Sequence, residues 1–398
     1  MELYLNYKRG MCMDLRIGTI LFGPSDQSVL MYKDVGMVLY VLAKSYHWKA
    51  HYYFFKTKKE EPAWTESFLK YVTPVCIAEE SAYKKQVQLA KQYLQAHAKE
   101  LDVLMLFNYG STNWKLARVA KKVNPHIVVY CKLDMGASGF SHFVNHRFGI
   151  TLKNYFEKLK SSYVDWFTVE TKEYFNELAK TSVFKNRIAY LPNGVSLLNV
   201  NTDFVEKQKK ENMVLASGRI GLYVKNNELL VDAIQKIPRD IVDTWKFYFV
   251  GPYTDEFYQH VKSVKSLKPY LADKIILTGK IMDRNQLYSY YQRAKIICMT
   301  SRTEGACIAT LEAMYFGAYP VITRYSSFAD DTTNYEKCGT IVSADADILA
   351  ELLAKKMQDP ELVAQGDECQ RYARKMFNYD VLAGKLDQQL RKLMDKRE

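Results

Sequence analysis

Short runs of β-branched and aromatic residues alternate along the chain with stretches in which apolar residues recur every three or four positions. In the first half, the runs predict strands at 16–23, 51–55, 101–107, 126–132 and 166–170, and the periodic stretches predict helices at 35–45, 114–122 and 172–180. Alternating strands and helices are typical of parallel sheets that helices cover on both faces.

The same alternation restarts after Asn193 and Gly194, which predicts a second domain. We expect strands at 213–217, 246–251, 274–279, 295–300 and 319–323, with helices at 227–237 and 285–294. The polar segment 199–212 has few apolar residues, so we place a linker there. The prediction is an α/β protein with two Rossmann-like domains facing a cleft, residues 1–196 and 197–375. A charged amphipathic helix follows at 376–398, with Leu382, Leu386 and Leu390 four residues apart.

Composition excludes several classes of protein. The chain has 398 residues, 48% of them apolar and 25% charged, as in ordinary globular proteins. No apolar run approaches the roughly 20 residues of a membrane-spanning helix, and Lys8 and Arg9 follow the apolar residues of the N-terminus, which is the wrong order for a signal peptide. The seven cysteines are odd in number and include no C-x-x-C pair, and their spacing is not that of a zinc site or a disulfide framework. These features predict a cytoplasmic protein.

The positive charge is concentrated in the first half of the chain. The net charge is +12, and residues 1–196 hold 27 basic and 17 acidic residues, a net +10. Such an excess indicates either an anionic partner or simply a lysine-rich composition. The basic residues are scattered rather than gathered in a stripe, which argues against nucleic acid. Residues 152, 155, 156 and 159 fall on one helical face beside lysines, which fits either an anionic membrane surface or an ordinary buried stripe.

Two segments of the second domain carry unusual chemistry after predicted strands, where open α/β sheets bind ligands. In the first, Gly218 and Arg219 precede Lys225 at the start of a helix, so that a close backbone, two cations and helix amides favour a pyrophosphate. In the second, Glu304 precedes a helix and Glu312 lies on it, about 12 Å further along. Carboxylates accept hydrogen bonds from sugar hydroxyls, so this spacing suits the two sugars of a nucleotide-sugar.

Taken together, these segments resemble the retaining glycosyltransferases of family 4, with the two-domain architecture called GT-B (glycosyl transferases group 1). The resemblance spans nearly the whole chain. It is carried by a hinge-like segment at 191–195, the Gly218, Arg219 and Lys225 group, glycine turns ending at Gly251 and Gly279, the segment from Glu304 to Glu312 with 313–321 after it, and a final helix that would cross back to the N-terminal domain.

The resemblance implies a role for each matching residue. Arg219 and Lys225 would hold the donor diphosphate, Glu304 the hydroxyls of the donor sugar and Glu312 those of the ribose. It implies retention through front-face attack, in which the leaving phosphate takes the acceptor proton, and no metal or cofactor. Further donor contacts would come from Gly218, Gly251, Lys280, Ile281, Gly305, Ala306, Cys307 and Ile308.

The first half departs from the family pattern at two places. Where the family often has a glycine pair, the chain has Lys33, Asp34, Val35 and Gly36. Where the family often has a His-Asp pair, leucine precedes Asp134. We expect Asp134 to contact the donor sugar and to belong to the catalytic set. We place Lys33, Asp34, Gly36, Lys132 and His142 on the acceptor side, with His146 as a further candidate.

The function implied is transfer of a sugar, a hexose from a UDP-sugar, to a hydroxyl of a glycan acceptor. The acceptor would be lipid-linked and met at the inner face of the plasma membrane, in bacterial surface polysaccharide or glycoconjugate synthesis. Two alternatives stay open. An inactive binding or scaffold partner would be favoured if the missing histidine abolished activity, and a sugar-nucleotide epimerase on the same scaffold would need no acceptor.

Overall fold

The computed structural model describes residues 15–23, 30–57, 63–144 and 152–396, and the chain divides into two compact units. The first unit comprises residues 1–168, 178–189 and 383–398, and the second comprises 169–177 and 190–382. The change of unit at 189/190 precedes the predicted boundary at 196/197. None of the helices among the described residues combines the length and apolarity that crossing a membrane requires.

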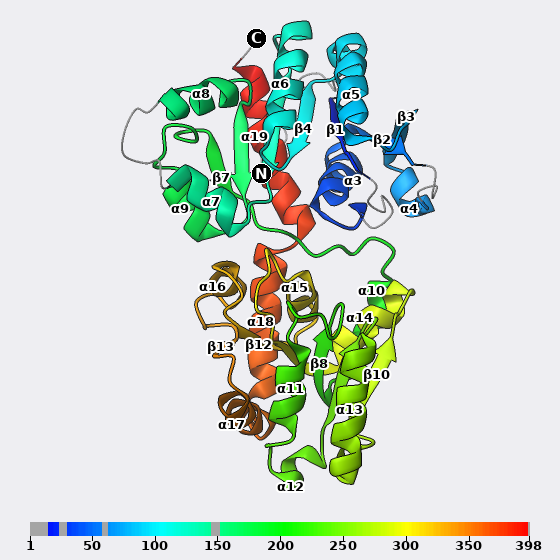
Figure 1. The fold of residues 1–398 in the computed structure, drawn as a ribbon. Coiled ribbons are helices and arrows are strands. Elements are labelled where there is room, and N and C mark those ends of the chain that lie inside the picture. Colours follow the sequence, from blue (N-terminus) through cyan, green and yellow to red (C-terminus); the bar gives the residue numbers. More distant parts are fainter. Residues whose placement is uncertain (1–14, 24–29, 58–62, 145–151, 397–398) are drawn as a thin grey trace, which may run out of the picture. The chain divides into compact units, whose positions relative to one another are not determined.

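The first unit is built on a seven-stranded sheet with the order β3-β2-β1-β4-β5-β6-β7. Strand β1 pairs in parallel with β2 and β4, β2 with β3, and β4 with β5. The strands are β1 Arg16–Ile20, β2 Lys49–Lys56, β3 Val72–Glu79, β4 Val103–Phe107, β5 Val128–Leu133, β6 Trp166–Val169 and β7 Ile188–Tyr190. The helices between them are α3 Asp34–Tyr46, α4 Glu66–Leu69, α5 Tyr83–His97, α6 Ser111–Val123, α7 Ala137–Val144, α8 Leu152–Ser161 and α9 Lys172–Leu178 (Figure 1).

The second unit repeats this architecture with a six-stranded sheet of order β10-β9-β8-β11-β12-β13, in which each neighbouring pair is parallel. The strands are β8 Glu211–Ser217, β9 Lys246–Val250, β10 Ile275–Gly279, β11 Ala294–Met299, β12 Tyr319–Thr323 and β13 Thr340–Val342. The helices are α10 Thr202–Glu206, α11 Asn227–Ile234, α12 Arg239–Val242, α13 Asp255–Leu267, α14 Arg284–Arg293, α15 Ile308–Tyr315, α16 Phe328–Thr332, α17 Ala346–Met357 and α18 Leu362–Met376. Helix α19, Tyr379–Asp395, begins in the second unit and belongs to the first from Ala383 onward.

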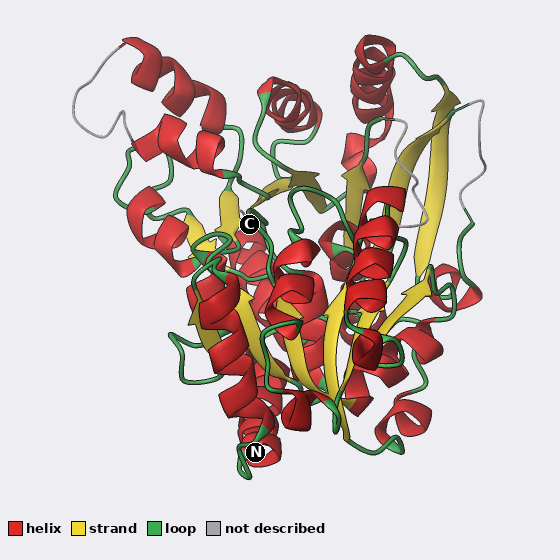
Figure 2. Ribbon diagram, turned by 60° about the horizontal axis from the view of Figure 1, so that its bottom comes forward, coloured by secondary structure: helices red, strands yellow, loops and turns green. Residues whose placement is uncertain are grey.

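The central strands are largely buried because helices cover both faces of each sheet (Figure 2). All residues of β5 and of β12 are buried, and the second unit has a continuous core that includes Phe247, Phe249 and Leu311. The predicted α/β class with two Rossmann-like domains is therefore confirmed.

The end of α19 packs within the first unit, to which residues from Ala383 onward belong. Leu386 and Leu390 are fully buried, and the Trp48 indole donates a hydrogen bond to Asp387 Oδ1 at 2.6 Å. The four-residue spacing of the leucines thus marks the buried face of this helix.

The predicted linker at 199–212 is instead part of the second unit, and it contains α10 and the start of β8. Lys210 explains the difference. Its ammonium donates to the backbone carbonyls of Ala294 and Phe316, both at 2.8 Å, and burial lowers the pKa of this lysine to about 7. A polar segment whose donors are satisfied by the neighbouring backbone is indistinguishable from a linker by composition alone.

Candidate functional site

The strand order reverses at one point in each sheet, between β1 and β4 in the first and between β8 and β11 in the second. In open parallel sheets, the loops that leave adjacent strands at such a point diverge to opposite faces and leave a crevice where ligands bind. The residues singled out from the sequence fall at these two points: Lys225 follows β8, Glu304 follows β11, and Asp134 follows the neighbouring strand β5.

In the second unit, the loop after β8 and the loop after β11 are joined by hydrogen bonds. The Arg302 backbone N–H donates to Val224 O at 2.9 Å and its guanidinium to Asn226 Oδ1 at 2.6 Å. The Thr300 hydroxyl donates to Asn226 O at 2.8 Å, and Asn226 has the left-handed φ of 49° that lets the chain enter α11. This bracing fixes the position of Lys225, which stands directly before Asn226.

The braced loops bring Lys225 into contact with Glu304. The Lys225 ammonium donates to Glu304 Oε1, which also accepts a hydrogen bond from the Ser301 hydroxyl at 2.8 Å. Each side chain of the ion pair is 15% exposed, so the pair is partly accessible to solvent. Ser301, Thr300 and Arg302 were not predicted. The signal that could have found them is a run of three polar residues directly after a buried strand.

Glycines allow the backbone to come close to this ion pair. Gly218 and Gly251 have φ values of 136° and 133°, and a Cβ on Gly251 would lie 1.9 Å from Gly218 O. A Cβ on Gly218 would in turn lie 4.0 Å from Lys225 Nζ, so the turn after β8 runs directly past the lysine. Arg219 follows Gly218 and is exposed. The predicted cations and glycines of this group therefore lie together.

The remaining donor-side residues lie at the start of α15 and at the end of β10. Among the described side chains, none caps the start of α11 or α15 with a hydrogen bond, which leaves these helix ends suited to an anion. Cys307 is buried, and burial raises the pKa of its thiol to about 11, so it is not a thiolate at neutral pH. Other members of the set are accessible to different degrees: Gly305 and Lys280 are exposed, and Ala306, Ile308 and Ile281 are half-buried.

Glu312 lies in a separate buried network that the sequence did not predict. The Tyr288 hydroxyl donates to Glu312 Oε1 at 2.6 Å, and Arg284 Nη2 lies 3.9 Å from the same oxygen. Burial raises the pKa of Glu312, and the Arg284 guanidinium opposes that rise. Arg284 also donates to Ser196 O at 2.6 Å, so the network ties the hinge-like segment to α15.

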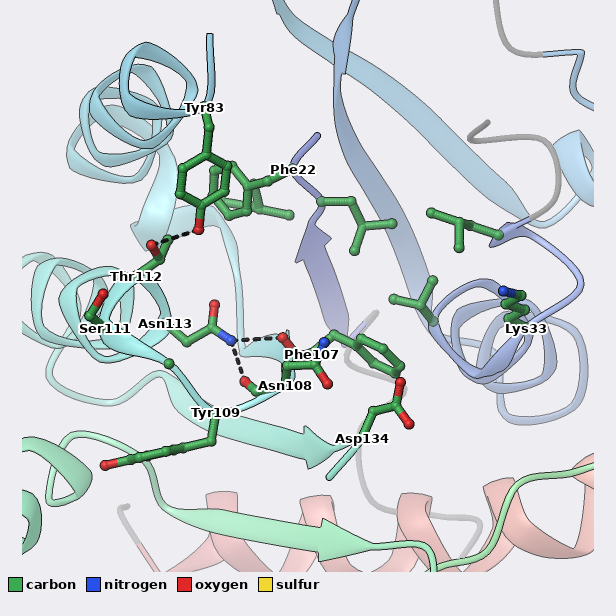
Figure 3. Close-up of a pocket in the computed structure, with 15 residues that line it drawn as sticks. Phe22, Lys33, Tyr83, Phe107, Asn108, Tyr109, Ser111, Thr112, Asn113 and Asp134 are labelled. Carbon is green, nitrogen blue, oxygen red and sulfur yellow. Dashed lines mark hydrogen bonds between the residues drawn. The ribbon is translucent and has the colours of Figure 1, made fainter. Parts of the chain in front are cut away.

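In the first unit, a cavity of about 550 Å³ lies at the carboxyl ends of β1 and β4 (Figure 3). Its wall is shaped by Asn108, whose φ of 65° is left-handed. The Asn113 side-chain amide donates to Phe107 O at 2.7 Å and to Asn108 O, which holds this turn. On another wall, the hydroxyls of Tyr83 and Thr112 are hydrogen-bonded at 2.8 Å. The volume is within the range of small-molecule sites.

The structure separates the predicted acceptor-side residues into three groups. Lys33 lines the cavity, together with Asp134, which was predicted to contact the donor sugar. Asp34 and Lys132 form an ion pair at 3.2 Å whose side chains are only 7% and 2% exposed. His142 lines a different, neighbouring cavity.

Gly36 is required by packing, since a Cβ there would lie 2.4 Å from Met31 Cα. His146 falls outside the described residues.

Asp134 is accessible to water, yet the cavity walls remove much of the solvent around it. This burial raises the pKa of its carboxyl, and the Asp34 carboxylate raises it further, while the ammonium groups of Lys132 and Lys33 lower it. Within residues 15–23, 30–57, 63–144 and 152–396, no three His, Cys, Asp or Glu side chains are grouped closely enough to hold a metal ion.

Two parallel α/β units, with charged and glycine-rich loops at the point where the strand order reverses, define a two-domain Rossmann-like protein of the type that binds nucleotides. Residues 201–376 match the family model described as "Glycosyl transferases group 1". The matched segment, which holds Lys225 and Glu304, is thus similar to that family, in agreement with the family resemblance.

A curated relative is the Campylobacter jejuni GalNAc-alpha-(1->4)-GalNAc-alpha-(1->3)-diNAcBac-PP-undecaprenol alpha-1,4-N-acetyl-D-galactosaminyltransferase, 28% identical over 152 residues. That alignment covers 38% of this chain and 38% of the relative. Among solved structures, Anabaena Alr3699/HepE in complex with UDP and glucose is 14% identical, with a TM-score of 0.64 over 95% of this chain and 100% of that one. Sucrose-phosphate synthase from Thermosynechococcus elongatus is 17% identical, with a TM-score of 0.66 over 96% and 100% of the two chains. These structural likenesses show the fold.

Proposed function

We propose that the chain is a retaining glycosyltransferase that moves a hexose-type sugar from a UDP-sugar to a hydroxyl of a lipid-linked glycan. The observation that carries this proposal is the accessible ion pair of Lys225 and Glu304, held by two cross-linked loops at the reversal point of a glycosyl transferases group 1 sheet. A cation for a diphosphate and a carboxylate for sugar hydroxyls stand side by side there.

The ion pair suggests how the donor is received. In the unliganded protein, Lys225 and Glu304 neutralise each other. A donor diphosphate takes over the ammonium of Lys225, together with Arg219 and the amides at the starts of α11 and α15. The Glu304 carboxylate is then released to accept hydrogen bonds from the donor sugar. UDP is the proposed carrier because the Anabaena structural neighbour holds UDP and glucose. Glu312 is proposed to reach the ribose hydroxyls.

The proposed reaction replaces one bond at the anomeric carbon with another on the same face. The bond to the leaving phosphate oxygen breaks and the bond to the acceptor hydroxyl oxygen forms, while the hydroxyl proton passes to the departing phosphate. Lys225 and Arg219 stabilise the charge that develops on the diphosphate, which is an electrostatic contribution that increases in the transition state. The same two cations make a metal ion unnecessary, so we expect transfer to persist in the presence of a chelator.

The acceptor side is proposed to lie in the first unit, at the cavity lined by Lys33 and Asp134. The Campylobacter relative acts on a glycan linked to undecaprenol through a diphosphate, and we propose an acceptor of that kind. Contact with the inner membrane face is supported by α8, where Phe156 and Leu159 are 51% and 49% exposed beside Lys158, and by the net +10 of the first 196 residues.

The deciding experiment is a thermal-shift panel of nucleotides and UDP-sugars on the wild type and two lysine variants. A ligand at a hundredfold excess over its Kd stabilises the folded state by about 2.7 kcal/mol. We expect a UDP-sugar to raise the Tm of the wild type but not that of Lys225→Ala. The matched control is Lys236→Ala, which removes a lysine of the same unit from a surface ion pair with Asp347.

Two outcomes would contradict the proposal. Equal shifts in Lys225→Ala and the control would place the donor elsewhere, and no shift with any member would favour an inactive scaffold. Transfer itself is then measured with alkyl glycosides of α-1,4-linked N-acetylgalactosamine as acceptors, one to three sugars long. Conversion of the donor into a second nucleotide-sugar without an acceptor would instead indicate an epimerase.

A further inference from the structure

A second cavity of about 310 Å³ adjoins the first within the first unit. The two share the wall formed by Tyr109, Gly110 and Ser111, between β4 and α6. Beyond that wall, the second cavity is lined by Trp114, Gly139, His142, Phe143, Glu157 and Lys160. The proposed function uses only the first cavity, so the second has no role in it.

Tyr109 is the divider between the two cavities, and it is held rigidly. Its hydroxyl donates to Glu157 Oε2 at 3.2 Å, and its ring lies edge-on to Phe143 with centroids 5.3 Å apart. The chain enters Tyr109 from the left-handed residue Asn108, which Asn113 holds by hydrogen bonds. In Figure 3, the ring of Tyr109 points away from Asp134 and Lys33. A ligand that passes this wall meets one aromatic face fixed by three independent contacts.

The charges and surfaces of the second cavity select its occupant. Glu157 and Lys160 form an ion pair at 2.9 Å. Each therefore neutralises part of the other's charge and attracts a charged ligand less strongly. The remaining walls are aromatic, from Tyr109, Trp114 and Phe143, with the His142 imidazole and small residues between them. Flat rings with a few hydrogen-bonding groups between them suit a neutral, hydroxyl-rich molecule rather than a phosphate or a fatty chain.

We propose that the second cavity is a sugar subsite, so that the acceptor ends in a neutral oligosaccharide whose terminal sugar occupies the first cavity and whose next sugar lies beyond Tyr109 against Trp114. This proposal rests on the proposed function and specifies its acceptor. Because the two cavities share one wall, an acceptor with two sugars fills both of them. An acceptor with a single sugar leaves the second cavity unused.

The test compares acceptors of one and two sugars in the N-acetylgalactosamine series, with kcat/KM as the readout. In the wild type, we expect the two-sugar acceptor to be preferred about tenfold, the effect of one well-packed aromatic contact. Trp114→Ala abolishes that preference, and Trp114→Phe, which keeps an aromatic face, restores most of it. Tyr258→Ala, which removes an exposed aromatic ring from α13 of the other unit, keeps the full preference.

The outcomes separate this proposal from the proposed function. Equal kcat/KM values for one and two sugars in the wild type overturn the second subsite, as does a Trp114→Ala variant that keeps the tenfold preference. Donor-induced stabilisation without transfer to any member of the series also overturns it, since a neutral oligosaccharide is then not the acceptor. Absence of donor-induced stabilisation marks failure of the proposed function itself.

Discussion

Each unit contains a lysine–carboxylate ion pair close to the carboxyl ends of its central strands, and the two pairs differ in one property. In the second unit, Lys225 and Glu304 are each 15% exposed. In the first unit, Lys132 and Asp34 are 2% and 7% exposed, at a distance of 3.2 Å. In both pairs a lysine contacts a carboxylate near the carboxyl ends of central strands. The pairs differ in their access to solvent.

That difference decides what each pair can do. Lys132 lies within β5, whose residues are all buried, so its ammonium cannot be offered to a ligand without opening the core. Lys225 stands in a loop that passes close to Gly218, where the backbone leaves space beside the ammonium. An ion pair that a ligand can reach, such as Lys225 and Glu304 (the accessible pair), serves binding. A pair enclosed in the core, such as Lys132 and Asp34 (the sealed pair), stabilises the fold only as long as both partners remain.

Breaking the sealed pair is expected to give the largest effect. Lys132→Met leaves the Asp34 carboxylate buried without its lysine, and such a loss costs about 3–5 kcal/mol of unfolding free energy. The measurement is urea denaturation of the wild type and the variant. Lys236→Met, which breaks an ion pair whose side chains are 43% and 78% exposed, serves as the control and costs less than about 1 kcal/mol.

The double variant Lys132→Met/Asp34→Leu sharpens this test. It removes both charges, so we expect it to be more stable than Lys132→Met alone. A Lys132→Met variant as stable as the wild type would mean that the buried pair contributes nothing, and the contrast between the two pairs would then be lost.

Breaking the accessible pair is expected to affect transfer rather than stability. Removing one group that stabilises charge in the transition state lowers kcat by about 10²–10³-fold, so we expect such losses for Lys225→Ala and for Glu304→Ala. The free energy of unfolding should change by no more than about 1 kcal/mol, as for other exposed pairs. Steady-state kinetics and denaturation of the same samples check both statements.

The double variant Lys225→Ala/Glu304→Ala is expected to lose less than the product of the two single effects, because the groups act as a unit. Full turnover by either folded single variant would refute the assignment of this site. A loss of stability as large as that of Lys132→Met would show that the accessible pair is structural as well.

The site of the second unit could be predicted closely from the sequence, because it lies in loops after strands where glycines, cations and carboxylates indicate binding of a phosphate and a sugar. The strand at Tyr319–Thr323 was predicted with its bounds, and Lys225 and Glu304 were predicted as neighbours in function and are in contact. The brace from Arg302 was missed because its hydrogen bond joins residues 76 positions apart, which leaves no periodic signal. The hydrogen bond from Ser301 to Glu304 was missed because it lies within an irregular loop.

The first unit was predicted less well, and burial is the physical reason. A lysine and an aspartate near predicted strand and helix ends were placed together on the acceptor side, but whether such a side chain faces a cavity or the core depends on tertiary packing. Helix α5 was missed because its buried face consists of Gln86, Ala90 and Leu94, of which only one is large and apolar. The cavity wall at Tyr109 was missed because a turn forms it, and a turn leaves no periodic pattern of apolar residues in the sequence.

The smallest expected effect concerns the pKa of Asp134 in the cavity, which the Asp34 carboxylate of the sealed pair raises. Burial and the Asp34 carboxylate raise the pKa of Asp134, so its carboxyl becomes protonated at a higher pH than an ordinary aspartate. If the ionised form binds the substrate, kcat/KM for transfer falls as pH is lowered, and the fall begins above the ordinary pKa of about 3.9. Asp134→Asn is expected to lower kcat/KM at neutral pH and to abolish this acid limb.

Two further variants test the direction of each charge effect. Asp34→Asn removes a carboxylate that raises the pKa of Asp134, so the acid limb should move to lower pH. Lys33→Met removes an ammonium that lowers it, so the limb should move to higher pH. The pH profile of kcat/KM in the three variants is the measurement. A shift to lower pH in Asp34→Asn would establish that the sealed pair influences the electrostatics of the cavity, and the opposite shift in Lys33→Met would show that the limb belongs to Asp134. A wild-type profile in Asp34→Asn would leave the sealed pair a purely structural contact.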